Sequence, residues 1–186
     1  MLSELKPYLE GFIRKPARFF AEMGLTPNHL TICGFILSIV CFFVYRSGWE
    51  LLGGIFLLLC GFFDVMDGAV ARLTSQQTTF GGFLDSVVDR YSDFLVLAGM
   101  LLGGLANLSW TLFAILGSFM VSYTRARAEA AGTGKLAVGL AERGERLLIL
   151  AIFSVLRLTN YGVILVALLS NITAVQRILV AKSRLT

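Results

Sequence analysis

The chain has 186 residues, of which 56% are hydrophobic and only 15% are charged. Soluble domains average about 45–50% apolar and about 25% charged residues, so this composition excludes an ordinary soluble protein and indicates one integral membrane domain over residues 1–186. The net charge of +4 is modest, and we expect no nucleic-acid partner. The 3 cysteines lie in apolar runs, which favours neither a disulfide framework nor a zinc site.

Residues 1–29 form a segment of their own ahead of the apolar runs. They carry charges of both signs and hold no long apolar stretch, so we expect no cleaved signal peptide there. Residues 3–22 mix large apolar side chains with charges, a pattern typical of an amphipathic helix in the membrane interface. Pro7 and Pro16 are expected to start or break this helix. Its role is either to anchor the first span or to cover an active site.

Six apolar segments follow, each suited to crossing a membrane. A span needs about 20 residues, because about 30 Å of hydrocarbon is crossed at about 1.5 Å per residue. The joins between the segments are short, so consecutive spans are expected to be antiparallel neighbours in an all-α bundle of six transmembrane helices. The predicted spans are roughly 30–46, 51–72, 80–105, 108–128, 142–158 and 160–180.

The basic residues indicate the orientation of these spans. Of the 16 lysines and arginines, 13 fall in the N-terminal segment, after the second span, between the fourth and fifth spans and at the C-terminal end, all on one side of the membrane. Arg46 and Arg157 fall on the other side, and Arg90 lies inside the third span. Because basic residues favour the cytoplasmic side, both termini are expected there.

All aspartates of the chain lie in the second and third spans. Asp64 and Asp67 are spaced i,i+3, while Asp85, Asp89 and Asp93 are spaced i,i+4, so each set lies on one helix face. If the two spans are neighbours, the carboxylates repel one another unless cations lie between them. Oxygen ligands favour Mg²⁺, Mn²⁺ or Ca²⁺, and a pair of such ions is common in phosphoryl transfer. A cation transporter is the alternative from another class.

Small residues lie on the same helix faces as the aspartates. Gly68 and Ala71 share the face of Asp64 and Asp67, and Gly81 lies one turn before Asp85. This arrangement predicts a groove in which a ligand lies close to the helix backbone. Tight packing between membrane helices is the other explanation of the same residues.

The stretch 64–89 resembles the complete signature of the CDP-alcohol phosphotransferase family, D-x2-D-G-x2-A-R-x8-G-x3-D-x3-D. The resemblance extends along the chain and implies six membrane helices, usually a homodimer, and an enzyme that joins a CDP-linked lipid to an alcohol with release of CMP. The lipid would be CDP-diacylglycerol or CDP-archaeol. The matching positions are Asp64, Asp67, Gly68, Ala71, Arg72, Gly81, Asp85 and Asp89.

The resemblance also implies roles for single residues. Asp64, Asp67 and Asp85 would share one divalent ion, Mg²⁺ or Mn²⁺. Asp89 would complete a second ion site and act as general base. Nucleotide contacts are implied for Asp64, Asp67, Gly68, Ala71, Arg72, Gly81, Asn28 and Thr31.

Two further interpretations concern the surroundings of the signature. Asn28 and Thr31 belong to a segment that resembles a recurrent family segment near the nucleotide, and a helix N-cap would explain the same residues. Asp93 lies outside the signature, where Arg90, three residues before it, is a candidate partner.

Segments 122–130 and 141–146 resemble the subfamily that uses inositol phosphate, the bacterial phosphatidylinositol phosphate synthases and archaeal archaetidylinositol phosphate synthases. This resemblance implies that Arg125, Arg143 and Arg177 bind the acceptor's phosphate, a task that guanidinium groups suit. It also implies the plasma membrane of a prokaryote, with the active site cytoplasmic. A solvated cytoplasmic loop is the alternative for this region, and glycerol phosphate is the alternative acceptor.

Overall fold

The computed structural model describes residues 6–185. Within that range there is no β-strand, which confirms the all-α class. Helices α2 to α7 correspond in order to the predicted spans, although α7 continues beyond residue 180. The helices are α1 (Lys6–Glu22), α2 (Pro27–Arg46), α3 (Glu50–Leu73), α4 (Thr79–Leu102), α5 (Leu108–Ala130), α6 (Arg143–Val155) and α7 (Thr159–Leu185).

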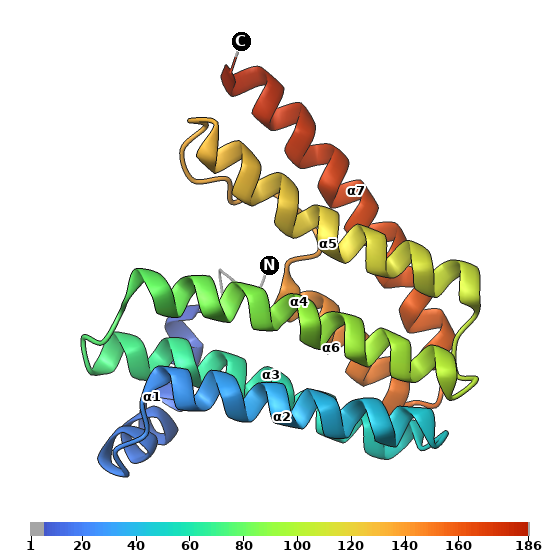
Figure 1. Ribbon diagram of the computed structural model, residues 1–186, viewed down its shortest axis with the longest axis horizontal. Coiled ribbons are helices and arrows are strands. Elements are labelled where there is room, and N and C mark those ends of the chain that lie inside the picture. The colour runs from blue at the N-terminus through green and yellow to red at the C-terminus, as the bar shows by residue number, and fades with distance from the viewer. Residues whose placement is uncertain (1–5, 186) are drawn as a thin grey trace.

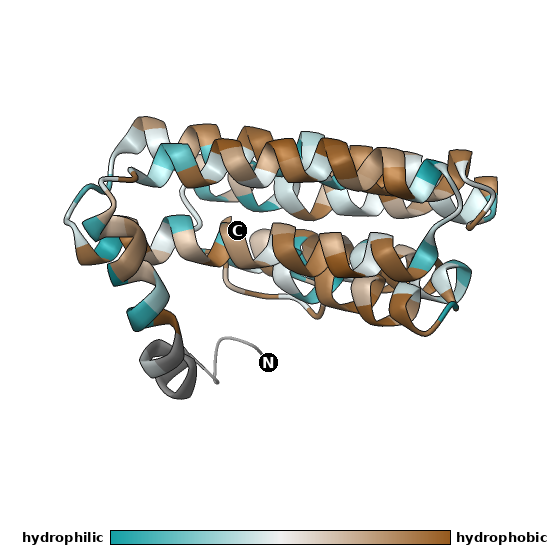
Figure 2. Cartoon of the chain, turned by 90° about the horizontal axis from the view of Figure 1, so that it is seen from below, coloured by the Kyte–Doolittle hydropathy of each residue, from teal (hydrophilic) through white to brown (hydrophobic). Residues whose placement is uncertain are grey.

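Helix α1 crosses one end of the bundle instead of running along it (Figure 1, Figure 2). Ala17 on its apolar side is buried in a cluster with Met66 of α3. The helix continues through Pro16, so the prediction that this proline breaks it is wrong. Packing on α3 offsets the hydrogen bond that the proline cannot make. Pro7 lies in the first turn, as expected, and residues 3–5 of the predicted helix lie outside the described residues.

Thr26 caps the start of α2. Its hydroxyl accepts the His29 N–H at 3.4 Å, and its own N–H donates to His29 Nδ1 at 3.3 Å, which forms a capping box. Pro27 follows at the start of the helix, where its missing N–H costs nothing. This cap fixes the first turn of α2, which carries Asn28 and Thr31.

The helices form two groups joined by α6 and by the contact of α4 with α5. Helix α2 packs on both α3 and α4, while α5 pairs with α7, and α6 packs on α3 and α7 (Figure 1). Helices α5 and α6 do not pack extensively on each other, and neither do α3 and α4, so the prediction that consecutive spans are neighbours is wrong for these two pairs. Aspartates of α3 and α4 line the space between these two helices, and their like charges oppose close approach of the two backbones.

Buried polar groups link the helices at the end opposite α1. Tyr45 is fully buried, and its hydroxyl lies 2.9 Å from Ser154 Oγ. Thr159 Oγ1 donates to Glu50 Oε2 at 2.9 Å. These bonds tie α2, α3, α6 and α7 together, because buried polar groups are costly unless they are paired. These bonds leave the other end of the bundle, the end that α1 crosses, free to open into a site.

The outer surface of the helices is strongly apolar. Phe43, Leu58, Phe113 and Ile172 are among its large exposed hydrophobic side chains, and Figure 2 shows mainly hydrophobic residues along the middle of the helices. Three of the described helices, α2, α3 and α7, are long and apolar enough to span a membrane. Helix α4 carries Asp85, Asp89, Arg90 and Asp93, and α6 has only 13 residues. The chain is a membrane protein of the all-α class.

Close packing of α4 on α2 gives the first prediction. A Cβ added at Gly99 would lie 2.8 Å from the Phe42 carbonyl oxygen. Gly99→Ala should lower the thermal unfolding midpoint of the detergent-solubilised protein, because overpacking against backbone costs about 1–3 kcal/mol. Gly61→Ala on α3 is the control, since a Cβ there meets nothing within 4 Å and alanine favours helix. Equal midpoints for the two variants would contradict this packing.

Candidate active site

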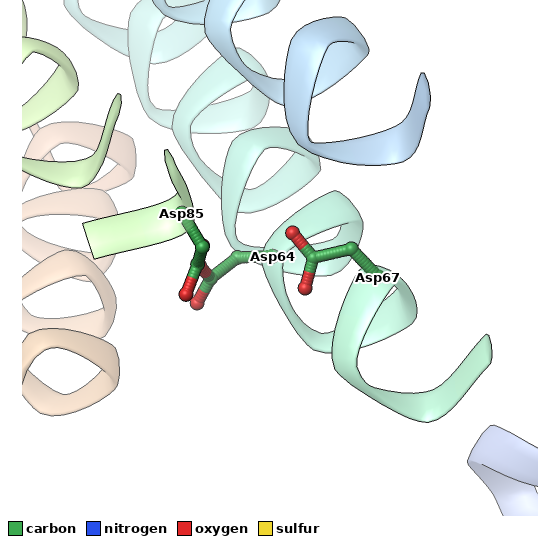
Figure 3. Close-up of side chains that lie close together, drawn as sticks. All are labelled: Asp64, Asp67 and Asp85. Carbon is green, nitrogen blue, oxygen red and sulfur yellow. The ribbon is translucent and has the colours of Figure 1, made fainter. Parts of the chain in front are cut away.

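The carboxylates of Asp64, Asp67 and Asp85 converge between α3 and α4 (Figure 3). One oxygen from each lies within 4.8 Å of the others. Ligands of one ion can be at most about 4–5.2 Å apart, twice a metal–oxygen bond of about 2.0–2.6 Å, so this all-oxygen donor set fits a hard divalent ion. Asp67 is buried and accepts a hydrogen bond from Thr31 Oγ1 at 2.7 Å, which orients its carboxylate.

The start of α4 is fixed just before Asp85. Thr78 caps the helix, and its Oγ1 accepts the Gly81 N–H at 2.9 Å. A Cβ added at Gly81 would lie 2.9 Å from that oxygen and 3.3 Å from Asn28 Oδ1. Gly81 is thus a point of close packing between α2 and α4. Asp85 follows one turn later on the same face.

A groove of about 600 Å³ opens beside the aspartates, between the starts of α2 and α4 and the end of α3. We call it the α2–α3–α4 groove. With the exception of Asp64, every residue for which the sequence predicts a nucleotide contact lines it. Asp64 lines an adjoining pocket of about 250 Å³ together with Asp67, Asp85 and Asp89. The groove is lined by Pro27, Asn28, Thr31, Asp67, Gly68, Ala71, Arg72, Gln76, Gln77, Thr78, Gly81, Gly82 and Asp85.

A second pocket, of about 770 Å³, lies between α4, α5, α6 and α7, and we call it the arginine pocket. The three arginines predicted to share one acceptor site all line it, although they come from three helices. Asp85 also lines the α2–α3–α4 groove, so the two spaces meet at this aspartate. The arginine pocket is lined by Asp85, Ser86, Asp89, Arg90, Asp93, Val121, Ser122, Arg125, Glu142, Arg143, Gly144, Arg146 and Arg177.

Arg143 makes the central ion pairs of the site. Its NH1 contacts the Asp64 carboxylate and lies 2.9 Å from Asp89 Oδ1. Its Nε lies 3.5 Å from Asp93 Oδ1. Arg143 is the first residue of α6, where a capping box between Glu142 and Glu145 fixes the helix start. One guanidinium therefore balances carboxylates of both α3 and α4.

Arg177 lies deeper in the arginine pocket than the other two predicted arginines. It is 2% exposed, and its Nε donates to the Val138 carbonyl oxygen at 2.7 Å. Its NH1 donates to the Val121 carbonyl oxygen, and its NH2 lies 3.8 Å from Glu142 Oε1. These backbone acceptors hold the Arg177 side chain of α7 against α5 and against the segment that precedes α6.

Arg125 lies at the more open side of the arginine pocket and pairs within its own helix. Its Nε donates to Glu129 Oε1 at 3.1 Å. Glu129 Oε1 also accepts the Leu136 N–H at 2.9 Å. The pair leaves the remaining guanidinium donors of Arg125 available to a ligand.

Arg146 was absent from the predicted site residues, yet it belongs to the arginine pocket. It is 3% exposed, and its NH2 donates to Asp93 Oδ2 at 2.7 Å. A buried guanidinium needs such a partner. The available signal in the sequence was its i,i+3 spacing from Arg143, which places both arginines on one face of α6.

Asp93 therefore pairs with α6 and not with Arg90, the partner suggested by sequence spacing. Arg90 NH1 donates to the Ser86 carbonyl oxygen and lies 3.5 Å from Asp89 Oδ2. The side chain of Arg90 turns toward the preceding turn of its own helix, which leaves Asp93 to the arginines of α6. Sequence spacing within α4 carries no information about a contact made by another helix.

Comparison with known proteins identifies what this arrangement is similar to. The family model described as CDP-alcohol phosphatidyltransferase matches residues 24–180. The chain is 45% identical over 185 residues to the archaetidylinositol phosphate synthase of Pyrococcus horikoshii. This match covers 100% of this chain and 98% of that protein. Two solved structures of Mycobacterium tuberculosis phosphatidylinositol phosphate synthase also match, each at 32% identity. The structure with CDP-DAG bound gives a TM-score of 0.79 and covers 91% of this chain and 92% of the other. The structure in complex with manganese and citrate gives 0.80, with 92% and 89% covered.

The second prediction concerns the ion that the three aspartates would hold. Asp67→Asn should weaken Mn²⁺ binding to the purified protein by at least about 10-fold, since loss of even a supporting group of a metal site costs that much. Asparagine keeps an oxygen for Thr31, so the helices should stay in place. Mn²⁺ titration followed by electron paramagnetic resonance measures the affinity. Glu22→Gln removes an exposed carboxylate of α1 as control. Equal affinities in both variants would exclude this ion site.

Proposed function

Because the chain belongs to the CDP-alcohol phosphatidyltransferase family, we propose that it transfers the lipid phosphate of a CDP-linked lipid to a hydroxyl of inositol phosphate and releases CMP. The observation that carries this proposal is the position of Asp85 on the border of two spaces. One is lined by residues expected to contact a nucleotide, and the other by Arg125, Arg143 and Arg177. Donor and acceptor bound in these spaces would meet at the aspartates.

The α2–α3–α4 groove suits the CDP part of the donor. Gly68, Ala71 and Gly81 line it without bulk, so a nucleotide can lie against helix backbone. A Cβ added at Gly68 would lie 3.3 Å from Arg72 NH1, so glycine leaves room for a guanidinium that can pair with a phosphate. The apolar outer surface of the helices can accept the chains of either CDP-diacylglycerol or CDP-archaeol.

Asp64, Asp67 and Asp85 would hold one divalent ion, Mg²⁺ or Mn²⁺, and Asp89 would complete the site of a second. When bound, such ions offset the negative charge of the diphosphate and of the transferred phosphoryl group. The manganese complex of the Mycobacterium tuberculosis relative supports this assignment. Arg143, in contact with Asp64, adds a fixed positive charge at the same place.

Asp89 would act as the general base. It lines both the pocket of Asp64 and the arginine pocket, and its Oδ1 lies 2.9 Å from Arg143 NH1. The acceptor hydroxyl gives its proton to Asp89 as its oxygen bonds to the β-phosphorus, the one that bears the lipid. The bond from that phosphorus to the bridging oxygen breaks, and CMP leaves with that oxygen.

The arginine pocket suits a phosphorylated acceptor. Arg125, Arg143 and Arg177 bring positive charge that a phosphate dianion would balance and that serine or free inositol would not. Glycerol phosphate carries the same phosphate and is the second candidate acceptor. The names of the relatives favour inositol phosphate.

The same proposal includes the arrangement in the membrane. Residues 1–186 would form one membrane domain, with α1 in the interface and α2 to α7 as six spans. Both termini and the active site would face the cytoplasm of a prokaryote, because most basic residues gather on that side. The family resemblance supports a homodimer in the plasma membrane.

An acceptor panel tests the proposed function. Purified protein in detergent is given CDP-diacylglycerol or CDP-archaeol with inositol phosphate, glycerol phosphate, inositol or serine, and CMP release is followed. We expect CMP only with a divalent ion, fastest with inositol phosphate, and none after chelation. CMP release that is faster with glycerol phosphate would move the assignment to that acceptor. Divalent-ion transport into sealed vesicles without CMP release would replace the transferase by a transporter.

The third prediction tests the general base. Asp89→Asn should abolish CMP release while largely sparing CDP-lipid binding, because an amide keeps the shape of the side chain and an oxygen toward the ion but cannot take a proton. Binding is measured by isothermal titration calorimetry with CDP-lipid in the presence of Mn²⁺. Near-normal turnover in the variant would remove Asp89 from this role.

The fourth prediction tests the acceptor phosphate site. Arg125→Ala should raise the KM for inositol phosphate by about 10- to 150-fold, since a charge-assisted contact contributes about 1.5–3 kcal/mol. The KM for CDP-lipid should change little. Arg127→Ala is the matched control, because Arg127 is exposed on the same helix and lies outside the pocket lining. Equal effects of the two variants on the KM for inositol phosphate would show that Arg125 contributes only positive charge to this region and no specific contact.

A further inference from the structure

The segment 131–142 joins α5 to α6 without helix or strand, yet neighbouring side chains hold its backbone. Glu129 Oε1 accepts the Leu136 N–H at 2.9 Å. Arg177 Nε donates to the Val138 carbonyl oxygen at 2.7 Å. The segment ends where α6 begins, so its position sets the position of the first turn of α6 in the arginine pocket.

Thr173 of α7 holds the last part of this segment. The residue is fully buried, and its Oγ1 accepts the Leu140 N–H at 3.1 Å and the Ala141 N–H at 3.2 Å. Gly139 packs directly on Thr173, and a Cβ added there would clash with the Thr173 methyl group. Gly139 also has a φ of +141°, which glycine adopts without strain. The backbone of 139–141 is therefore fitted to one side chain of α7.

A chain of contacts connects Thr173 with Arg143. The Ala141 carbonyl oxygen accepts from Arg146 NH1 at 3.0 Å. Arg146 NH2 donates to Asp93 Oδ2 at 2.7 Å, and Asp93 Oδ1 lies 3.5 Å from Arg143 Nε. Ala141 is thus held at both its N–H and its carbonyl, two residues before Arg143.

We propose that Thr173 is a positioning residue for the acceptor. By holding the N–H groups of Leu140 and Ala141, it fixes Arg143 and Arg146 in the arginine pocket. Thr173 itself lines neither the arginine pocket nor the α2–α3–α4 groove, so its effect passes through the backbone of this segment. The inference rests on the proposed function, which assigns the arginine pocket to the phosphorylated acceptor.

Thr173→Val tests the proposal, because valine keeps the shape of threonine and removes the accepting oxygen. The KM for inositol phosphate should rise about 10-fold, while the KM for CDP-lipid stays within about 2-fold. Thr173→Ser keeps the oxygen and should return the KM for inositol phosphate to near its wild-type value. Thr111→Val is the matched control, since Thr111 is also fully buried and its hydroxyl donates to the Asn107 carbonyl oxygen at 2.8 Å, outside the lining of the pocket.

Hydrogen exchange gives a second measurement on the same variants. Thr173→Val should speed amide exchange at Leu140 and Ala141 and leave α2 and α3 unchanged. An equal rise of both KM values overturns the proposal, and so does faster exchange with an unchanged KM for inositol phosphate. If the valine variant is not recovered folded, Thr173→Ala removes the same oxygen and supports the same comparison. Wild-type protein that releases no CMP with inositol phosphate would overturn the proposed function instead.

Discussion

Repulsion among aspartates enclosed by apolar helices is the constraint on which this bundle depends. Asp67 and Asp93 are 7% and 8% exposed, and like charges in such surroundings are costly unless they are paired. Helices α3 and α4 accordingly share α2 as a neighbour and leave a space between themselves, which α6 enters with Arg143 and Arg146. The position of α6 then determines the position of the segment 131–142 before it, and with it the face of α7 that contacts this segment. Charge balance thus specifies the packing around the aspartates.

The helices and the aspartate faces could be predicted because their causes are local. Apolar runs of about 20 residues form membrane helices, and i,i+3 or i,i+4 spacing places side chains on one face. The continuation of α1 through Pro16 could not be predicted in this way, because it depends on packing against α3, far along the chain. The separation of α3 from α4 likewise depends on side chains that face each other only after folding.

The candidate site likewise contains residues that local sequence patterns predict and contacts that they do not. Signature spacing located the groove residues of α3 and α4, because these two segments follow each other in the sequence, whereas Asn28 and Thr31 of α2 came from a separate resemblance. The grouping of Arg125, Arg143 and Arg177 followed from resemblance, since no periodicity relates three different helices. Asp93 pairs with Arg146, and Thr173 accepts a hydrogen bond from the segment before α6. Both contacts join elements that are distant in sequence, so no local pattern predicts them. Contacts of that kind become visible only in three dimensions.

The shortness of α6 has a consequence for how the two substrates arrive. Its 13 residues reach about 20 Å, roughly 10 Å less than the hydrocarbon thickness. In the proposed arrangement of six spans, with the far end of α6 at the opposite surface, the arginines at its start would lie below the membrane surface by that difference. Irregular backbone exists at such depth only where protein or water covers it. In that arrangement the phosphorylated acceptor would reach the arginine pocket through a water-filled opening, while the CDP-linked lipid would enter from the leaflet, so the proposed reaction would join a water-soluble and a lipid substrate beneath the membrane surface.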